Sequence, residues 1–220
     1  MIPLLFIAIA LVSYALGSFN GVMLLSRFVF HKDLRRYGSR TAGYTNFVRV
    51  FGSKWGIAAI LVDVLKSVIA VLFGGLLMLI PGQGFPVIGR LFAGLWLTLG
   101  HMYPVQYQFR GGRGVVCFLT ALWLADWRVG LIASAVFIIV IAFSQYVSMA
   151  SICACFVGAV STWIFVASED LKGLAGTLAM ITAVIIIWRH RGNILRMLNR
   201  KEPRVKWGRQ PSRRIREDNF

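Results

Sequence analysis

Long apolar runs alternate with short polar and basic segments along the chain. Residues 3–26 contain no Asp, Glu, Lys or Arg, and further apolar runs with few charges cover about 55–80, 91–107, 114–125 and 173–188. A bilayer core about 30 Å thick needs roughly 20 apolar residues per helix, because lipid offers no partner for an unpaired backbone group. Each run therefore predicts one membrane-spanning helix.

The longest uncharged stretch, residues 129–168, has 40 positions without a charge. As a single helix it would reach about 60 Å at about 1.5 Å per residue, about twice the thickness of a bilayer core. Two helices must therefore share it, and the polar residues 144–151 predict the turn between them. The pattern predicts an all-α, polytopic integral membrane protein with seven transmembrane helices. A re-entrant segment at the short run 114–125 would instead place the most basic segment outside.

Composition agrees with a membrane protein, since only 15% of the residues are charged against about a quarter in soluble domains. Most of the net charge of +16 lies in two segments: 27–54 has seven Lys or Arg against one Asp, and 189–220 has eleven against three acidic residues. The positive-inside rule places both in the cytoplasm. Seven spans then give an outside N-terminus and a cytoplasmic C-terminus, and the first run is expected to stay as a helix rather than be cleaved.

No internal repeat or linker divides the chain, so we expect one transmembrane domain over 1–200 and a basic cytoplasmic tail over 201–220. On a membrane protein such a tail is explained by topology and by anionic lipids, so membrane lipids are expected partners and nucleic acid is not. The three cysteines lie in apolar runs without metal-ligand spacing, and the three histidines are far apart in sequence. We expect no metal and no cofactor.

Four polar clusters rich in Gly, Ser, Asn and Arg fall on the same predicted side of the membrane. They cover residues 38–49, 100–114, 146–151 and 189–196. Glycines let backbone N–H groups approach a ligand, and guanidinium groups suit phosphate oxygens. Taken singly, such loops are usually turns and such arginines are usually topological anchors. Together on one face of an apolar bundle, they predict a site for an anionic, phosphorylated ligand at the cytoplasmic membrane surface.

Three ionisable residues lie inside predicted spans. Asp63 and Lys66 are spaced i,i+3 and therefore share one helical face. Ionisable residues at membrane depth are functional candidates, but this pair can neutralise itself, so an ion pair or structural support is the favoured interpretation. His101, near the cytoplasmic end of its span, is either a hydrogen-bonded structural residue or a member of the site.

The polar motifs resemble, in order and spacing, those of the PlsY family, the bacterial integral-membrane glycerol-3-phosphate acyltransferases that use acyl phosphate as donor. The motifs that carry the resemblance are Gly17–Asn20, Asp33–Arg35, Gly38–Arg49, Asp63–Ser67, Gly100–Pro104, Phe109–Gly114, Ser148–Ser151 and Arg189–Arg196. The resemblance implies seven helices in the bacterial inner membrane, an outside N-terminus and an active site facing the cytoplasm. It also implies transfer of a fatty acyl group from acyl phosphate to glycerol 3-phosphate, giving lysophosphatidic acid in phospholipid biosynthesis.

The resemblance also implies two sets of site residues. The catalytic set is Ser39, Arg49, His101, Arg113 and Asn193. The set that binds the substrate phosphates is Gly38, Arg40, Gly43, Thr45, Asn46, Gly111, Gly112, Gly114, Ser148 and His190. In this interpretation cationic, glycine-rich loops hold two phosphates close together, and catalysis is positioning plus electrostatic stabilisation.

The first motif departs from the family pattern. Arg40 stands where the family has glycine, Tyr44 where it has alanine, and Arg113 in a later motif replaces lysine. Arg40 brings a cation to the place of a phosphate, which leaves open a transferase with a different phosphorylated acceptor. A non-catalytic lipid-binding or anion-binding homologue, or a transporter, is the third hypothesis, although transporters usually show inverted repeats or broken helices.

Overall fold

The structure, a computed structural model, describes residues 2–80, 85–166 and 172–205. Within these ranges the chain is helical and contains no strand. The α-helices are α1 (Ile2–Ser18), α2 (Gly21–Phe28), α3 (Tyr44–Phe51), α4 (Ser53–Leu77), α5 (Pro86–Met102), α6 (Val115–Ala125), α7 (Trp127–Ser144), α8 (Val147–Phe165), α9 (Lys172–Arg189) and α10 (Arg191–Leu198). Two short 3-10 turns, η1 (Leu34–Arg36) and η2 (Val105–Tyr107), lie in the loops.

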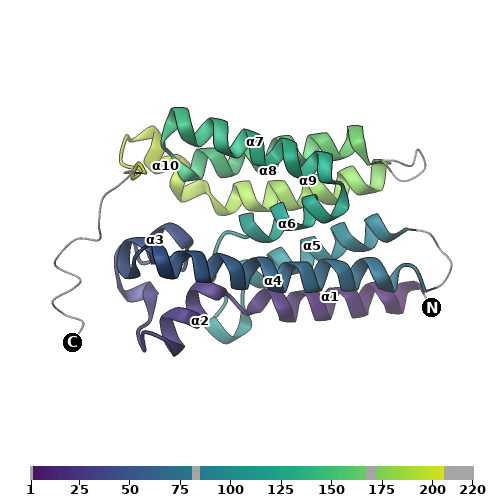
Figure 1. Ribbon diagram of the computed structural model, residues 1–220, viewed down its shortest axis with the longest axis horizontal. Helices are drawn as coiled ribbons and strands as arrows, with labels where there is room; N and C mark the ends of the chain where they lie inside the picture. Colours follow the sequence, from purple (N-terminus) through teal and green to yellow (C-terminus); the bar gives the residue numbers. More distant parts are fainter. Residues whose placement is uncertain (1, 81–84, 167–171, 206–220) are drawn as a thin grey trace.

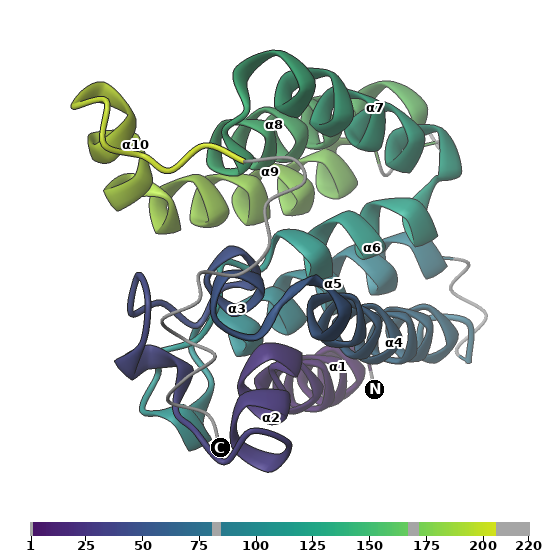
Figure 2. The ribbon, with the colours of Figure 1, turned by 60° about the vertical axis from the view of Figure 1, so that its left-hand side comes forward.

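The long helices run side by side in two groups (Figure 1). One group consists of α1, α4 and α5, and the other consists of α7, α8 and α9. Helix α6 lies between them and contacts helices of both groups (Figure 2). The short helices α2, α3 and α10 gather at one end of the bundle, opposite the end where α1 begins.

Glycines allow α5 to pack closely against both of its neighbours in the first group. A Cβ atom on Gly17 of α1 would lie 2.2 Å from the Leu97 carbonyl oxygen, and one on Gly100 would lie 2.2 Å from the Tyr14 carbonyl oxygen. On the other side of α5, a Cβ on Gly89 would lie 2.2 Å from the carbonyl oxygen of Gly74 in α4. Small residues at helix crossings are typical of packing inside membranes, where backbones must approach closely.

Helices α4, α7 and α8 are each long and apolar enough to cross a bilayer, and the number rises to five if the bent pairs α1–α2 and α9–α10 each count as one span. Helix α6 is apolar but has only 11 residues. Large apolar side chains point outward along the bundle; examples are Leu4, Leu61, Ile138, Ile164 and Val184, all more than half exposed. This surface suits lipid rather than water.

The helix boundaries confirm some of the predictions from the apolar pattern and correct others. The predicted short run became α6, and the break in the 40-residue uncharged stretch falls at Gln145 and Tyr146, inside the predicted turn. The prediction of one helix over residues 3–26 is wrong, because α1 ends at Ser18 and α2 leaves at 43°. Asn20 caps α2 by accepting a hydrogen bond from the Met23 N–H.

The predicted third run is shifted by five residues at each end. Helix α5 begins at Pro86 rather than about 91, since proline fits the first turn of a helix, and it ends at Met102. The following residues form η2 and a polar loop. Most of the predicted tail, residues 206–220, lies outside the described residues.

Candidate active site

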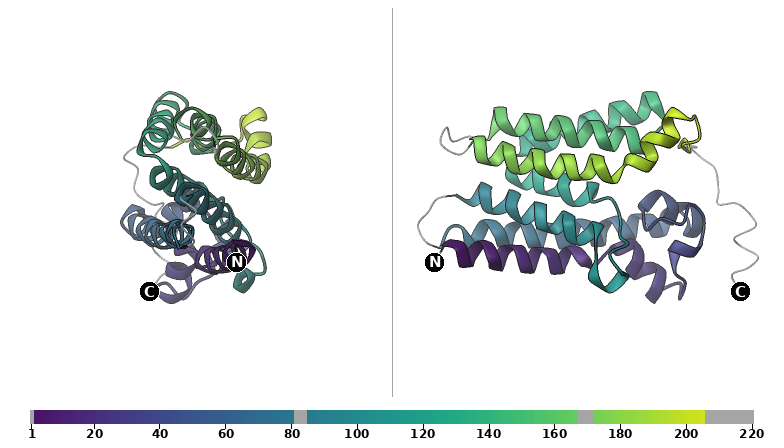
Figure 3. Two further views of the ribbon diagram at one scale, coloured as in Figure 1. Left: turned by 90° about the vertical axis from the view of Figure 1, so that its right-hand side faces the viewer. Right: turned by 180° about the vertical axis from the view of Figure 1, so that it is seen from behind.

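The four predicted polar clusters meet at the end of the bundle that carries α3 and α10 (Figure 3). The loop before α3 approaches the loop before α6, where a Cβ on Gly43 would lie 3.6 Å from Arg113 Nη1. Arg189, at the end of α9, donates long hydrogen bonds of 3.4 Å to the carbonyl oxygens of Gly111 and Gly112. The sequence prediction that these segments gather on one face is therefore confirmed.

Asn46, the third residue of α3, organises the first loop. Its Oδ1 accepts a hydrogen bond of 2.8 Å from the Ser39 N–H, and its Nδ2 donates to the carbonyl oxygens of Tyr37 and Thr41, 3.0 Å each. Gly38 has a φ of +57°, and a Cβ there would lie 2.2 Å from Asn46 Oδ1. Gly38 and the Asn46 amide thus shape the loop, which presents the exposed Ser39 hydroxyl to solvent.

The altered residues of the first loop separate in space. Arg40 adopts a φ of +56°, and it lines a cavity described below. Tyr44 instead packs toward the start of α4, where a Cβ on Gly56 would lie 3.0 Å from its ring. Thr45 and Arg49 lie on α3, with Arg49 exposed. Arg40 and Thr41, which stands where the family has asparagine, therefore both lie where a departure from the family pattern changes the surface of the cavity.

The second loop turns tightly over His101. The Gly111 N–H donates to the Met102 carbonyl and the Gly112 N–H to the His101 carbonyl, both at 3.0 Å. A Cβ on Gly112 would lie 2.2 Å from His101 Nε2, so only glycine fits there. Gly114, at a φ of +78°, forms the N-cap of α6.

Arg113 lies half-buried between these loops. Burial lowers the pKa of its guanidinium, the charges of Arg196 and Arg189 lower it further, and the carboxylate of Glu202 raises it. An arginine side chain nevertheless stays protonated in proteins. Arg113 is therefore a half-buried cation close to three segments of the site.

Asn193 of α10 and Ser148 of α8 form the third part of the site. Asn193 Nδ2 donates 2.7 Å to Ser148 Oγ and 2.6 Å to Glu202 Oε1, and Ser148 Oγ donates 2.5 Å to the same oxygen. Arg196 Nε donates 2.8 Å to Glu202 Oε2. Burial raises the pKa of Glu202, but the hydrogen bonds from Ser148, Asn193 and Arg196 outweigh this, and the net pKa is lowered.

Glu202 was missed by the sequence prediction, which placed it in the basic tail. One signal was available, because it is an acidic residue in a strongly basic segment. Its partners, however, come from α8 and α10 and are visible only in the folded chain.

His190 lies at the junction of α9 and α10 and is 1% exposed. Its Nδ1 lies 2.9 Å from the Ile186 carbonyl oxygen, which can only accept, so Nδ1 carries the proton and Nε2 is left as an acceptor. Burial lowers the pKa of His190 to about 4. The side chain is therefore neutral at pH 7.

His101 lies below the glycine loop, inside the bundle. Its Nδ1 is 3.1 Å from Lys66 Nζ and 3.6 Å from Asp63 Oδ1, and its Nε2 is 3.4 Å from Asn20 Nδ2. The predicted Asp63–Lys66 pair forms at 2.8 Å, with both side chains less than a tenth exposed. His101 thus connects a buried ion pair to the turn at Gly112.

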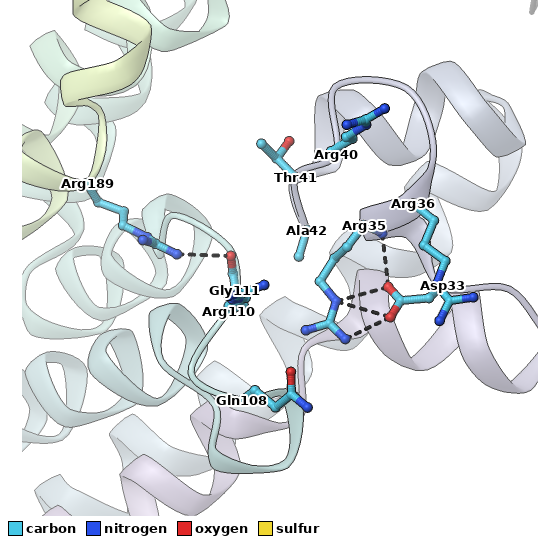
Figure 4. A pocket seen from close by; sticks show the side chains of 10 residues that line it. All are labelled: Asp33, Arg35, Arg36, Arg40, Thr41, Ala42, Gln108, Arg110, Gly111 and Arg189. Atoms are coloured by element: carbon cyan, nitrogen blue, oxygen red, sulfur yellow. Dashed lines mark hydrogen bonds and ion pairs between the residues drawn. The ribbon is translucent and has the colours of Figure 1, made fainter.

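A cavity of about 610 Å³ opens between the first loop, the η2 loop and the end of α9 (Figure 4). We call it the arginine pocket; it is lined by Asp33, Arg35, Arg36, Arg40, Thr41, Ala42, Gln108, Arg110, Gly111 and Arg189. Arg40 and Gly111 are the two members of the predicted phosphate set among these residues. In the described part of the chain, no group of three His, Cys, Asp or Glu side chains is placed to hold a metal ion.

The family described as "Glycerol-3-phosphate acyltransferase" matches residues 7–200 of the chain. The chain belongs to this family. A family member named glycerol-3-phosphate acyltransferase from Geobacillus kaustophilus is 38% identical over 205 residues, covering 90% of this chain and 95% of that protein. One of the same name from Finegoldia magna is 31% identical over 199 residues, covering 90% and 96%.

Solved structures of the family agree with the fold. The crystal structure of PlsY, an integral membrane glycerol 3-phosphate acyltransferase, in its glycerol 3-phosphate form, superposes with a TM-score of 0.78 at 30% identity, covering 91% of this chain and 96% of that one. Its lysophosphatidic acid form gives a TM-score of 0.75 at the same identity, with 91% and 95% covered. The chain therefore has the all-helical fold of an integral membrane protein.

Proposed function

We propose that this protein is a membrane acyltransferase that moves a fatty acyl group from acyl phosphate to the hydroxyl of glycerol 3-phosphate. The products are lysophosphatidic acid and inorganic phosphate. The observation that carries the proposal is that the glycine loops, Arg113, Ser148 and Asn193 lie together at one end of the bundle. The chain also belongs to a family that is described as glycerol-3-phosphate acyltransferase.

The reaction needs no covalent enzyme intermediate, because phosphate is a good leaving group from a mixed anhydride. The acceptor oxygen attacks the acyl carbonyl carbon, the bond from that carbon to the phosphate oxygen breaks, and the phosphate leaves with the electron pair. The hydroxyl proton is taken up by the departing phosphate. The protein holds both phosphates and stabilises the charge that develops on the carbonyl oxygen.

The site residues divide by their surroundings. We place the half-buried Arg113 guanidinium against a substrate phosphate, and we assign the exposed Ser39 hydroxyl of the first loop and the exposed Arg49 guanidinium of α3 to the same phosphates. Asn193 and Ser148 offer polar hydrogens, and neutral His190 offers Nε2. The glycines and Asn46 aim the backbone. His101, with its ring nitrogens facing Lys66 and Asn20, positions the Gly112 turn rather than removing a proton.

In the membrane we place seven spans, formed by α1 with α2 and by α4 to α9, with the N-terminus outside. The site end, which carries α3 and α10, then faces the cytoplasm, where soluble glycerol 3-phosphate is available. The described residues of the two most basic segments, 27–54 and 189–205, lie at this end, which agrees with the positive-inside rule. Accessibility of single cysteines at Leu4 and at Asn199 to a membrane-impermeant thiol reagent tests this orientation. Labelling of position 199 in intact cells would contradict it.

The test of function uses the full chain in lipid nanodiscs, with acyl phosphate and labelled glycerol 3-phosphate, and identifies the product by mass. Asn193→Ala should lower the rate at least about 100-fold, as loss of an oriented polar hydrogen does at other charge-stabilising sites. Asn199→Ala, at the opposite end of α10 and exposed, is the matched control and should stay within about twofold. Arg49→Ala should behave like Asn193→Ala. Unchanged lysophosphatidic acid formation in both variants would overturn the assignments, and no turnover by the unaltered protein with any phosphorylated alcohol would overturn the function.

A further inference from the structure

Arg90 is a charged residue inside a membrane-spanning helix. Because α5 begins at Pro86, Arg90 is the fifth residue of this helix rather than a residue before the span. In the described part of the chain no carboxylate pairs with its guanidinium, and its Nε is buried without a hydrogen-bond partner. A cation at membrane depth is costly, and such a residue is by default a candidate for a functional role.

The Arg90 guanidinium caps the end of α6. Its Nη1 donates a hydrogen bond of 2.7 Å to the carbonyl oxygen of Leu124. Leu124 is the residue before the last of α6, so its carbonyl group has no partner within the helix. A cation is favourable here as well, because the last carbonyl groups carry the negative end of the helix dipole. Helix α6 ends inside the bundle while α4 and α5 extend further (Figure 1), so the cap lies where lipid would offer no donor.

A glycine in α4 makes room for the arginine side chain. A Cβ on Gly75 would lie 3.0 Å from both Cγ and Nε of Arg90. The side chain therefore starts on α5, lies against α4 and reaches the end of α6, so it connects three helices. Packing that confines a side chain in this way also holds its polar group in one geometry.

Helix α5 holds the other end of α6 too. A Cβ on Gly114, the N-cap of α6, would lie 2.6 Å from Thr98 Cγ2 and 2.9 Å from Met102 Cε. From Arg90 to Met102 the axis of α5 advances about 18 Å, and from Gly114 to Leu124 the axis of α6 advances about 15 Å, at about 1.5 Å per residue. The two lengths are similar, so α5 contacts α6 at both of its ends.

Between these two contacts, α6 faces the first helix group with small apolar side chains. Cys117 and Ala121 are buried in one cluster with Val71 of α4 and Leu97 of α5. Apolar contacts are non-directional, whereas a hydrogen bond weakens steeply when its angle is distorted. The hydrogen bond from Arg90 is therefore a contact that resists a shift of α6 along its axis.

We propose that Arg90 is a positioning residue for acyl transfer, which acts through α6 on Arg113. Arg113 directly precedes the N-cap Gly114, so a shift of α6 along its axis also moves the attachment point of this guanidinium. A misplacement of about 1 Å caused by a distant mutation can lower a rate strongly, because positioning supplies a large part of catalysis. The inference rests on the proposed function, since it concerns the cation that we place against a substrate phosphate.

The test compares Arg90→Met with Arg90→Lys, using the full chain in lipid nanodiscs. Methionine keeps an apolar stem and removes the donor, whereas lysine keeps a donor and the charge. Arg90→Met should lower kcat/KM for glycerol 3-phosphate about tenfold at saturating acyl phosphate, and Arg90→Lys should stay within about threefold. If Arg90→Met does not fold, Arg90→Gln, whose amide donor reaches less far, replaces it with the same expected outcome.

Hydrogen exchange of the backbone amides of residues 112–118 gives a readout that needs no turnover. The Gly112 N–H donates to the His101 carbonyl at 3.0 Å, and the Phe118 N–H donates to the Gly114 carbonyl at 2.9 Å. A displaced α6 weakens these hydrogen bonds, so exchange over 112–118 should be at least about threefold faster in Arg90→Met. It should be unchanged in Arg90→Lys.

Gly176→Ala is the matched control for a loss of stability alone. Its Cβ would lie 2.3 Å from Trp163 Cε2, at a contact of α9 with α8 that does not include α6. The unfolding temperature should fall, but kcat/KM should stay within about twofold, because distant sites act independently. Exchange over 112–118 should not change in this variant.

Three results separate the possible failures. If Arg90→Met unfolds at a lower temperature but keeps its kcat/KM and its exchange over 112–118, the proposal is wrong, because Arg90 then only stabilises the bundle. An equal loss of kcat/KM in Arg90→Met and Gly176→Ala would overturn it as well. If the unaltered protein shows no turnover with any acceptor, the proposed function fails, and exchange over 112–118 still decides whether Arg90 holds this end of α6.

Discussion

Two polar clusters of this protein each pair a carboxylate with a cation, but they differ in their exposure to solvent. The inner network, made of Asn20, Asp63, Lys66 and His101, pairs a carboxylate with an ammonium at 2.8 Å, and both side chains are less than a tenth exposed. The outer cluster, made of Ser148, Asn193, Arg196 and Glu202, pairs a carboxylate with a guanidinium at the same distance. There, however, the Arg196 side chain is 45% exposed.

The source of the polar groups differs as well. In the inner network, Asp63, Lys66 and His101 come from α4 and α5, which pack along their length. The backbone accepts the remaining hydrogen bonds of the ammonium: Lys66 Nζ donates to the carbonyl oxygens of Gly17 and Phe19. The outer cluster depends on a residue that follows α10 and folds back on it. The inner network is thus fixed by the bundle, whereas the outer cluster lies where a ligand from solution can reach it.

The strongest test of this comparison is Lys66→Met. It leaves the Asp63 carboxylate buried without its cation, which typically destabilises a protein by about 3–5 kcal/mol. Thermal unfolding in detergent should show the loss, and Lys54→Met, at the exposed start of α4, should show little change. The double variant Asp63→Asn with Lys66→Met should recover part of the loss, because the uncompensated charge is gone. No recovery would mean that shape, not charge, holds this region.

Gly112→Ala tests the turn that contacts His101 of the inner network and leads to Arg113 of the site. The new methyl group would meet His101 Nε2 at 2.2 Å, so the ring or the turn must move. We expect a loss of about 1–3 kcal/mol in stability, and a fall in transfer activity of more than tenfold because Arg113 moves with the turn. Gly173→Ala is the control, since its Cβ would meet nothing within 4 Å. Full activity in Gly112→Ala would show that the turn is not coupled to the site.

Glu202→Ala removes the carboxylate from the outer cluster. Asn193 Nδ2 then keeps only Ser148 Oγ as an acceptor, while the half-exposed Arg196 returns to water. The expected loss is about 1–2 kcal/mol, smaller than for Lys66→Met, because water compensates part of it. Glu202→Gln keeps an acceptor oxygen and should lose less than half as much. If the two variants unfold at the same temperature, the charge rather than the hydrogen-bond acceptor is what matters.

Near neutral pH, the smallest expected effect is a dependence on pH that arises at His190, beside the outer cluster. Its folded-state pKa of about 4 lies below the usual value of 6.5, so the unfolded chain binds a proton first as the pH falls. Stability should drop by about 1 kcal/mol between pH 6.5 and 5.5, and continue to drop toward pH 4. Unfolding temperatures of the protein and of His190→Gln measure the effect. His31→Gln, which is exposed, should keep the full pH dependence.

Glu202 extends this dependence to lower pH. Its folded-state pKa is also lowered, so its contribution is complete above the pKa of the unfolded chain and is lost as the pH falls through the folded value. In His190→Gln the remaining loss of stability should therefore appear only below about pH 4.5. A flat profile in that range would contradict the bonding of Glu202 in solution.

The helices could be predicted from hydropathy because lipid demands long apolar segments, and the turn at Gln145 and Tyr146 could be predicted because one helix cannot be about 60 Å long in a bilayer. The break after Ser18 could not be predicted in this way, since residues 3–26 are uniformly free of charge. Its cause is tertiary: Asn20 caps α2, and the freed carbonyls of Gly17 and Phe19 bind Lys66, which lies 49 and 47 residues further along the chain.

The site shows the same division. The motifs indicated the loops and the Asn193 and Ser148 side chains, which the structure brings to 2.7 Å. They could not separate Arg40 from Tyr44, because the direction of each side chain depends on which neighbour it packs against. Glu202 could not be predicted for a related reason, because its partner outside α10, Ser148, is 54 residues away in the sequence.

The interruption between α1 and α2 and the ammonium of Lys66 depend on each other. In an unbroken helix the carbonyl oxygens of Gly17 and Phe19 would accept from N–H groups one turn later. The Lys66 ammonium would then lose these two hydrogen-bond acceptors. Without the ammonium, the same two carbonyl oxygens would lie in an apolar interior without that hydrogen-bond donor. Neither feature can therefore be lost alone, and related chains should either retain both together or have replaced both in a single concerted change.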